Sequence, residues 1–153
     1  MKTKPLTFLL SLIFIFLFSG YVFGGDFQDG EDAFERKDYK TAYKLMLPLA
    51  EQGNAEAQWN LGYMTLFGKG VPQDYKEAVK WTRLFVEQGD ANAQLLLGSM
   101  YLKGKGVPQD DKEAVKWIRL SVEQGLDLAQ FVLGLLYEKG EVVPQDYQEA
   151  FNV

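Results

Sequence analysis

The sequence predicts an all-α protein, a right-handed α-solenoid of stacked helix-turn-helix units with a period of 36 residues. The stretch GKGVPQD occurs at Gly68–Asp74 and again, letter for letter, at Gly104–Asp110. An altered copy, GEVVPQD, spans Gly140–Asp146. Apolar and small residues recur at helical spacing between the copies. A fixed period in the thirties is typical of arrays in which each unit buries its apolar face against its neighbour.

The N-terminal segment, residues 1–24, is predicted to be a secretory signal peptide. Two lysines precede an apolar run from Leu6 to Phe18, and Val22 and Gly24 are small enough for the −3 and −1 positions of a cleavage site. The alternative is an uncleaved membrane anchor, because the apolar segment reaches the lower length limit for spanning a bilayer. No cysteine follows the run, so a lipoprotein anchor is excluded.

Charge and cysteine usage limit the partners. The chain has 16 basic and 21 acidic residues and a net charge of −5, which becomes −7 once Lys2 and Lys4 are removed. An acidic chain without a basic cluster repels phosphate backbones, so nucleic acid is not expected as a partner. We expect an exported protein, periplasmic or secreted. Without cysteines it would be held together by packing alone.

The remainder divides into a divergent helical repeat at 25–54, two full repeats at 55–90 and 91–126, and an incomplete repeat at 127–153. In the first repeat, DYKTAYKLMLPLAEQG aligns with DYKEAVKWTRLFVEQG at the same offset. Pro48 lies inside its second helix and is expected to kink or end that helix near Leu47.

Each full repeat contains two capped helices. In the first of them, Asn54 is the expected N-cap and Gly68 the left-handed C-terminal residue. The second helix begins after Asp74, and Glu77 stands at the spacing of a capping box. Gly89 ends it. The repeated turn therefore repeats the angle between helices, and the units stack into a curved rod.

Small and aromatic positions indicate how the units pack. Gly62, Gly98 and Gly134 lie inside first helices, where each costs about 1 kcal/mol relative to alanine. We therefore expect two helix backbones to approach closely there. Trp81 and Trp117 occupy equivalent positions and are expected to pack between repeats.

The last repeat is irregular. Val142 replaces the second glycine of the turn, so we expect that turn to be strained or differently shaped. Its second helix reaches only about two turns before Val153, which would leave Leu133 and Leu136 partly uncovered. Either the array is simply frayed or truncated, or another chain or copy completes it. The second reading predicts weak self-association through this open C-terminal edge.

These motifs resemble the Sel1-like repeat family, relatives of the tetratricopeptide solenoids. The matching residues are AEAQ–LG at 55–62, GKGVPQD with the following EAVKW, and the closing EQG. Thr65 departs from the usual tyrosine and Val142 from the usual glycine. The resemblance implies a scaffold or adaptor that holds other proteins. Some bacterial relatives are cysteine-rich and linked to penicillin binding or hydrolysis, but this chain has none of those cysteines.

No catalytic, cofactor-binding or metal-binding residue is predicted. The absence of histidine and cysteine excludes Ser-His-Asp and Cys-His systems and zinc sites that need those ligands. After residue 25 the only serines are Ser99 and Ser121, and neither begins the S-x-x-K signature. GKG lacks the spacing of a phosphate loop. We therefore expect a protein that is not an enzyme and uses no cofactor.

The best candidate for function is a partner-binding surface. The resemblance implies a concave face lined by first helices, and one stripe on these helices changes identity between repeats while the framework repeats. An alternative for Trp59 and Phe131 is packing between helices. The predicted partner-binding residues are Trp59, Asn60, Tyr63, Leu96, Ser99, Phe131 and Leu135.

The sequence thus predicts a non-catalytic scaffold of the bacterial cell envelope that binds a protein or peptide on the concave face. One alternative is an envelope enzyme or penicillin-interacting protein, by similarity to the cysteine-rich relatives. The other is a membrane-tethered adaptor that touches the membrane only through an uncleaved N-terminal segment.

Overall fold

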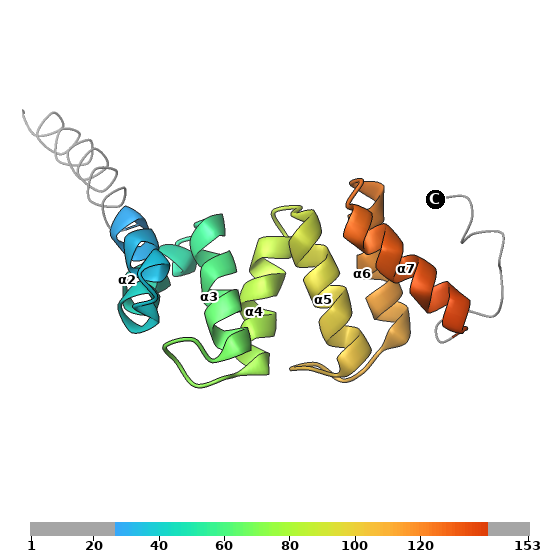
Figure 1. Ribbon diagram of the computed structural model, residues 1–153, viewed down its shortest axis with the longest axis horizontal. Helices are drawn as coiled ribbons and strands as arrows, with labels where there is room; N and C mark the ends of the chain where they lie inside the picture. Colours follow the sequence, from blue (N-terminus) through green and yellow to red (C-terminus); the bar gives the residue numbers. More distant parts are fainter. Residues whose placement is uncertain (1–26, 141–153) are drawn as a thin grey trace, which may run out of the picture.

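The computed structural model describes residues 27–140, which form a row of helices and contain no strand. A helical segment over 27–35 comes first. The helices that follow stand side by side in chain order (Figure 1). They are α2 (Tyr39–Glu51), α3 (Ala55–Phe67), α4 (Tyr75–Val86), α5 (Ala91–Lys103), α6 (Asp111–Glu123) and α7 (Asp127–Lys139). The α-solenoid predicted from the repeat is confirmed.

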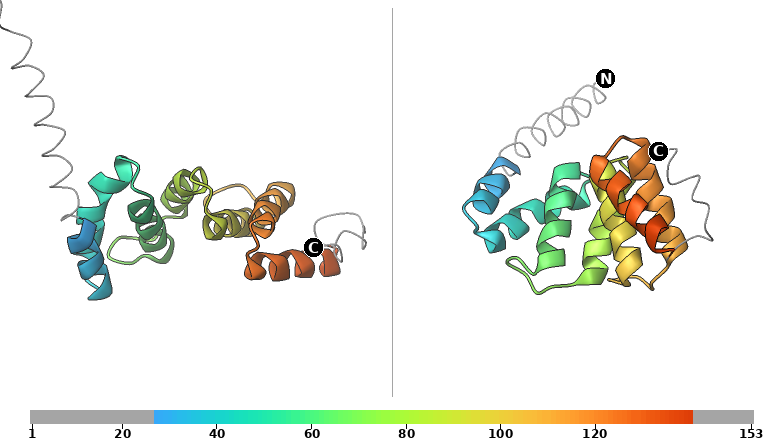
Figure 2. Two further views of the ribbon diagram at one scale, coloured as in Figure 1. Left: turned by 90° about the horizontal axis from the view of Figure 1, so that it is seen from above. Right: turned by 45° about the vertical axis from the view of Figure 1, so that its right-hand side comes forward.

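First and second helices of the repeats occupy opposite sides of the row. Seen from above, α3, α5 and α7 lie along one side and α2, α4 and α6 along the other (Figure 2, left). Both ends of the row bend toward the side of α3, α5 and α7, which makes it the concave side. The predicted signal peptide, the turn containing Val142 and the short final helix lie outside the described residues.

The predicted helix caps are confirmed. The side chain of Asn54 accepts a hydrogen bond from the Ala57 amide, and Gly68 has a left-handed φ of 66°. The Asp74 carboxylate accepts from the amides of Lys76 and Glu77. These local bonds satisfy amides at the helix start that have no partner within the helix, so the sequence alone sets where these helices begin.

The Glu77 side chain has another role than closing a capping box. Its Oε1 accepts a hydrogen bond from the Tyr43 hydroxyl on α2 at 2.8 Å and a longer one from Trp81 Nε1 at 3.3 Å. Burial, followed by the Glu77 carboxylate, raises the pKa of Tyr43 to about 12. Glu77 on α4 is therefore bonded to the preceding repeat through Tyr43.

The first repeat differs from the others in two ways. Its helices are joined by a short turn at 36–38, in which Lys37 has a φ of 63°. Pro48 lies within α2, which continues to Glu51, so of the two expected effects, a kink or an end near Leu47, the end is not observed. Pro48 is exposed, whereas Leu49 and Ala50 after it are buried. Water can bond the carbonyl that loses its amide partner, while the buried residues hold the last turn in place.

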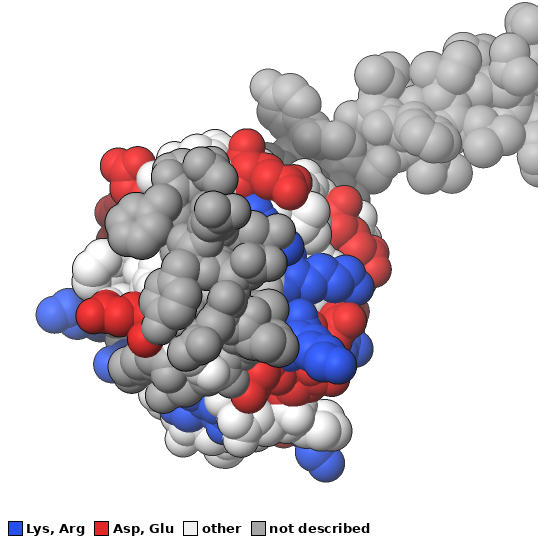
Figure 3. Space-filling view, turned by 90° about the vertical axis from the view of Figure 1, so that its right-hand side faces the viewer, with Lys and Arg blue, Asp and Glu red and all other residues white. Residues whose placement is uncertain are grey.

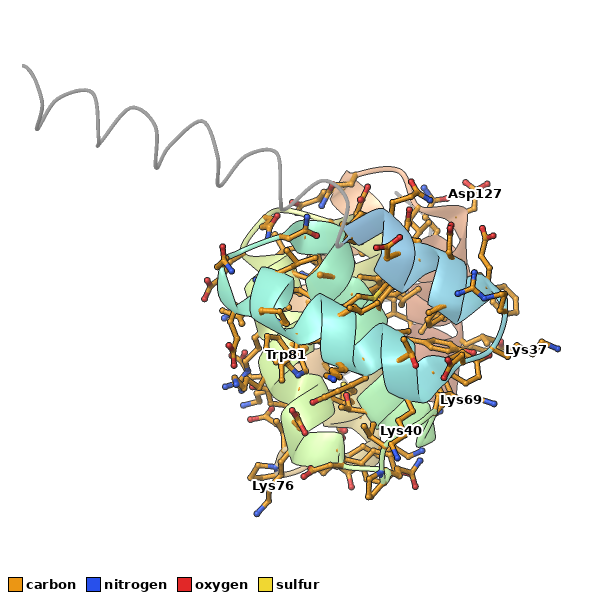
Figure 4. All side chains as sticks on the ribbon, turned by 90° about the vertical axis from the view of Figure 1, so that its left-hand side faces the viewer. Lys37, Lys40, Lys69, Lys76, Trp81 and Asp127 are labelled. Carbon is orange, nitrogen blue, oxygen red and sulfur yellow. The ribbon has the colours of Figure 1, made fainter. Side chains whose placement is uncertain are left out.

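The repeated turn is a contact between repeats as well as a connection within one. A Cβ on Gly70 would lie 2.5 Å from the backbone carbon of Tyr39, and one on Gly106 would overlap the carbonyl oxygen of Tyr75. Each turn therefore lies against the start of the second helix of the preceding repeat. A Cβ on Gly70 would also lie 2.6 Å from the amide nitrogen of Lys40 at the start of α2; Lys40 and Lys69, the residue before Gly70, are labelled in Figure 4. The second glycine is required because the two backbones meet there.

The glycines inside the first helices are not equivalent. A Cβ on Gly98 would lie 2.7 Å from Cγ1 of Ile118, so α5 and α6 do approach closely. At Gly62 the nearest atoms would be 3.6 Å away, an ordinary contact. Nothing described lies within 4 Å of such an atom at Gly134. The predicted close approach is confirmed at Gly98 and not at Gly62, and the second helix that would face Gly134 lies outside the described residues.

The core runs along the row as three clusters of buried side chains. Trp81 belongs to the first, with Ala42 and Met46 of α2, so its predicted packing between repeats is confirmed. Trp117 is half-buried against the second cluster. Leu133 and Leu136 are buried in the third, because they face α6, so the expectation that they are left uncovered is wrong.

Candidate binding surface

Tyr63 closes the space between the first helices of the first two repeats. Its ring lies 5.8 Å from that of Phe34, on the helical segment 27–35, and 4.8 Å from that of Phe67. The side chain is half-buried. At this junction the concave side is filled by aromatic side chains.

The next junction is open because Ser99 stands at the position equivalent to Tyr63. A cavity of about 220 Å³ lies between α3 and α5 here. Its lining is largely apolar, with Lys103 and Lys105 beside it. The Ser99 hydroxyl donates to the Leu95 carbonyl at 2.9 Å. The lining residues are Leu66, Phe67, Gln73, Leu96, Ser99, Met100, Lys103 and Lys105.

A second hollow lies between the N-terminal halves of the same two helices. Its volume is about 320 Å³, and the rings of Trp59 and Phe85 lie 5.5 Å apart in its wall. Asn60 and Asn92 add amide groups to this hollow. Three carboxylates also line it, those of Glu31, Glu56 and Asp90. We call the two hollows together the α3–α5 groove.

The charges of the groove are separated along its length. Glu56 and Asp90 lie at the N-terminal ends of α3 and α5, and Glu31 reaches the same hollow from the segment 27–35. The lysines lie at the C-terminal end of α5 and just after it. Asp90 caps α5 by accepting from the Ala93 amide. Within residues 27–140, Glu31, Glu56 and Lys103 have no charged side-chain partner, and Lys105 Nζ lies 4.9 Å from the ring centroid of Tyr75. The groove can therefore pair with charges on a ligand.

The structure gathers five of the predicted partner-binding residues along one seam of the concave side. Trp59 and Asn60 line the acidic hollow, Leu96 and Ser99 line the apolar cavity, and Tyr63 lies beside them on α3. Trp59 is half-buried, so it both packs on a neighbouring helix and lines the hollow.

The other two predicted residues lie elsewhere. Phe131 and Leu135 are on α7, where they are 63% and 38% exposed, and Leu128 on the same helix face is 57% exposed. Neither predicted residue lines the groove. Both do lie on a first helix, and the repeat period had placed them at positions equivalent to Trp59 and Tyr63.

Several residues that line the groove were not among the predicted ones, and Phe85 and Lys105 are two of them. Phe85 lies on the second helix of its repeat, where no partner-binding residue was predicted, and Lys105 lies in the repeated turn. A signal existed for Phe85, because the equivalent residue in the next repeat is the small Ser121. None existed for Lys105, since Lys69 stands at the same position of the preceding turn.

The described part of the chain holds neither a cluster of metal ligands nor a membrane-spanning helix. No group of three or more acidic side chains in residues 27–140 could hold a metal ion. No helix in that range is long and apolar enough to cross a membrane. Lys, Arg, Asp and Glu are interspersed on the surface seen from the α7 end (Figure 3).

A row of helix pairs with a grooved concave side defines the class of the protein as an α-solenoid. The sequence profile of the Sel1 repeat matches residues 25–54, 55–90, 91–126 and 127–152. The chain therefore belongs to the Sel1 repeat family. Proteins of this fold commonly act as protein-interaction scaffolds and are typically non-catalytic. No curated protein matches the chain.

Solved structures of Sel1 repeat proteins resemble the chain. A Sel1 repeat protein from Oxalobacter formigenes is 33% identical, with a TM-score of 0.75 over 82% of this chain and 51% of that one. A protective antigen present in uropathogenic Escherichia coli strains is 34% identical, with a TM-score of 0.78 over 85% of this chain and 29% of that one. The chain thus spans about half or less of the length of these two proteins.

A third structure supports the fold alone. The cysteine-rich protein B of Helicobacter pylori is 21% identical and has a TM-score of 0.57, over 73% of this chain and 95% of that one. The present chain has the same arrangement of helix pairs but contains no cysteine.

Proposed function

We propose that the protein is a non-catalytic adaptor of the bacterial cell envelope that binds a protein or peptide in the α3–α5 groove. The observation that carries the proposal is the break in the repeated framework at one junction. Tyr63 fills the space between first helices at the preceding junction, whereas Ser99 leaves a cavity of about 220 Å³ at the next. A repeat array that only needed to pack would gain by filling this space, since empty apolar volume forgoes contacts.

The groove also has the composition of a binding surface. Aromatic side chains such as Trp59 and Phe85 offer a large contact area and lose few rotatable bonds on binding. The helices on either side are joined through the buried core, so the groove is preformed. A partner then loses its own freedom while the scaffold loses little more, which favours affinity.

The location in the envelope rests on the N-terminal sequence. Two lysines, an apolar run and small residues before Gly25 have the pattern of an export signal. The absence of cysteine means that export into an oxidising compartment exposes no thiol to oxidation. Fractionation of cells that produce the tagged full-length chain, together with the N-terminal mass, tests this part. Recovery in the cytoplasm with Met1 intact would contradict it.

Site-directed crosslinking tests the binding part, because a chain without cysteine accepts a photo-crosslinker at one introduced thiol. Asn92→Cys and Lys103→Cys place it on exposed residues at the two ends of the groove, and Lys112→Cys places it on the exposed start of α6 as the control. We expect one envelope protein to be crosslinked from both groove positions and not from the control. Unlabelled protein should compete with it. Crosslinking that is equal at Lys112, or absent from both groove positions, would refute the proposal.

A further inference from the structure

We infer that the α3–α5 groove recognises the extended C-terminal end of a peptide. The last residue of this peptide is apolar and carries the free carboxylate, and a cationic residue stands three or four positions before it. The inference deepens the proposed function, on which it rests, by assigning the chemistry of the partner. It is carried by three features of the groove: the distance between its hollows, the apolar cavity at one end, and the opposite charges of the two ends.

The spacing follows from the helices that build the groove. On α3 the acidic hollow is lined at Trp59 and the apolar cavity at Phe67; on α5 the corresponding residues are Asn92 and Ser99. At about 1.5 Å of rise per residue, these separations are roughly 10–12 Å. An extended chain advances about 3.3 Å per residue. Three or four residues of a bound peptide therefore join the two hollows.

The apolar cavity suits a single side chain next to an anion. Its volume of about 220 Å³ is smaller than the roughly 300–1,000 Å³ of small-molecule sites. Phe67 and Leu96 form its sides, and the buried Met100 lines it as well. Lys103 and Lys105 stand beside it without carboxylate partners in the described chain. An aliphatic side chain inside would place an adjacent carboxylate at the lysines, where a charge-assisted hydrogen bond forms.

The other hollow suits a cation. The Trp59 and Phe85 rings offer faces to which a guanidinium or ammonium group is attracted. Glu31 and Glu56 line the same hollow and have no cationic partner in the described chain. An anionic amphiphile would satisfy only the lysine end of the groove and would meet these carboxylates at the other. A peptide that carries both charges satisfies both ends.

The test uses a fluorescein-labelled peptide that ends in Arg-Ala-Ala-Leu with a free carboxylate, joined to the dye through an N-terminal Gly-Gly spacer. Binding to the protein, purified after expression of the full-length chain, is followed by fluorescence polarisation. The comparison peptides are the C-terminal amide and the reversed order, Leu-Ala-Ala-Arg. We expect each to bind about tenfold more weakly, which corresponds to about 1.4 kcal/mol.

Variants locate the site. Ser99→Tyr copies the residue at the preceding junction, so it should fold and abolish binding by filling the cavity. Lys103→Glu changes an exposed residue and should weaken the acid peptide about tenfold while leaving the amide peptide nearly unchanged. Lys112→Glu on α6 should change neither. Circular dichroism checks that each variant is folded. If Ser99→Tyr does not fold, the effect of Lys103→Glu on peptide binding alone tests the inference.

The inference is overturned if the acid peptide does not bind at about 1 mM, if acid and amide bind equally, or if Lys103→Glu has no effect. The outcome is separable from that of the adaptor proposal. Crosslinking at Asn92 and Lys103 without binding of the peptide would leave the adaptor standing and refute this partner chemistry. Absence of both the crosslinking and the peptide binding would refute the adaptor proposal and this partner chemistry together.

Discussion

The contact between the repeated turn and the preceding repeat predicts that Gly106→Ala is strongly destabilising. Gly106 has a φ of 74°, and a Cβ there would overlap the carbonyl oxygen of Tyr75 and lie 2.9 Å from the amide nitrogen of Lys76. All of these are backbone atoms of a helix start, so none can rotate away. The turn would have to move off the preceding repeat.

The magnitude has two parts. The left-handed conformation costs an alanine about 1–2 kcal/mol. Displacement of the turn also weakens the packing of Val107 in the second core cluster and the Lys105–Tyr75 contact. Loss of such contacts in a core adds roughly 1–3 kcal/mol. We expect Gly106→Ala to lower the free energy of unfolding by about 3 kcal/mol in total.

Gly125→Ala is the matched control. Gly125 has a similar φ of 80°, but nothing lies within 4 Å of a Cβ built on it. It should therefore cost only the conformational part, about 1–2 kcal/mol. Urea unfolding followed by circular dichroism at 222 nm measures both variants. Equal losses for the two would refute the claim that the turn is held against Tyr75, because only that contact distinguishes the two sites.

Two more predictions follow from single contacts. Ultraviolet titration should show Tyr43 ionising near pH 12, because burial and then Glu77 raise its pKa. The folded pKa of Tyr43 lies above the unfolded value of about 10, so the contribution of its neutral phenol to stability is complete below pH 10 and is lost as pH rises toward 12. A Tyr43→Phe variant lacks this group, and a fall of its stability in parallel with that of the wild type over that window would contradict the reasoning. Alanine at Gly62 should stabilise by up to about 1 kcal/mol, whereas at Gly98 it should destabilise by about 1–3 kcal/mol, because only there would Cβ meet Ile118. Thermal unfolding of the pair checks the opposite signs, and a shift in the same direction for both would count against the packing described.

The helix ends and turns could be predicted because their causes lie within a few residues. Asn54 and Asp74 bond amides two or three positions ahead, and Gly68 is followed by a chain reversal that needs a left-handed residue. The continuation of α2 beyond Pro48 could not be predicted, for the complementary reason. The local cost of Pro48 was read correctly, but the burial of Leu49 beyond it depends on other helices.

The candidate site was predictable in part. The period placed Trp59, Asn60 and Ser99 on one side of first helices, and the structure brings them to one groove. It could not show that Phe85 reaches into that groove from a second helix. It also grouped Phe131 with these residues, although the groove does not extend to α7. Position within a repeat defines the side of the solenoid, but the neighbouring repeat decides what surrounds each side chain.

The sequence by itself determined the class of fold and the caps of α3 and α4, since these depend on periodicity and short-range hydrogen bonds. Only the tertiary structure separated residues that the repeat makes equivalent. Gly62 has room for a methyl group and Gly98 does not, while Tyr63 closes a junction that Ser99 leaves open. The physical reason is that packing is a property of two facing surfaces, and each repeat faces a neighbour with different side chains.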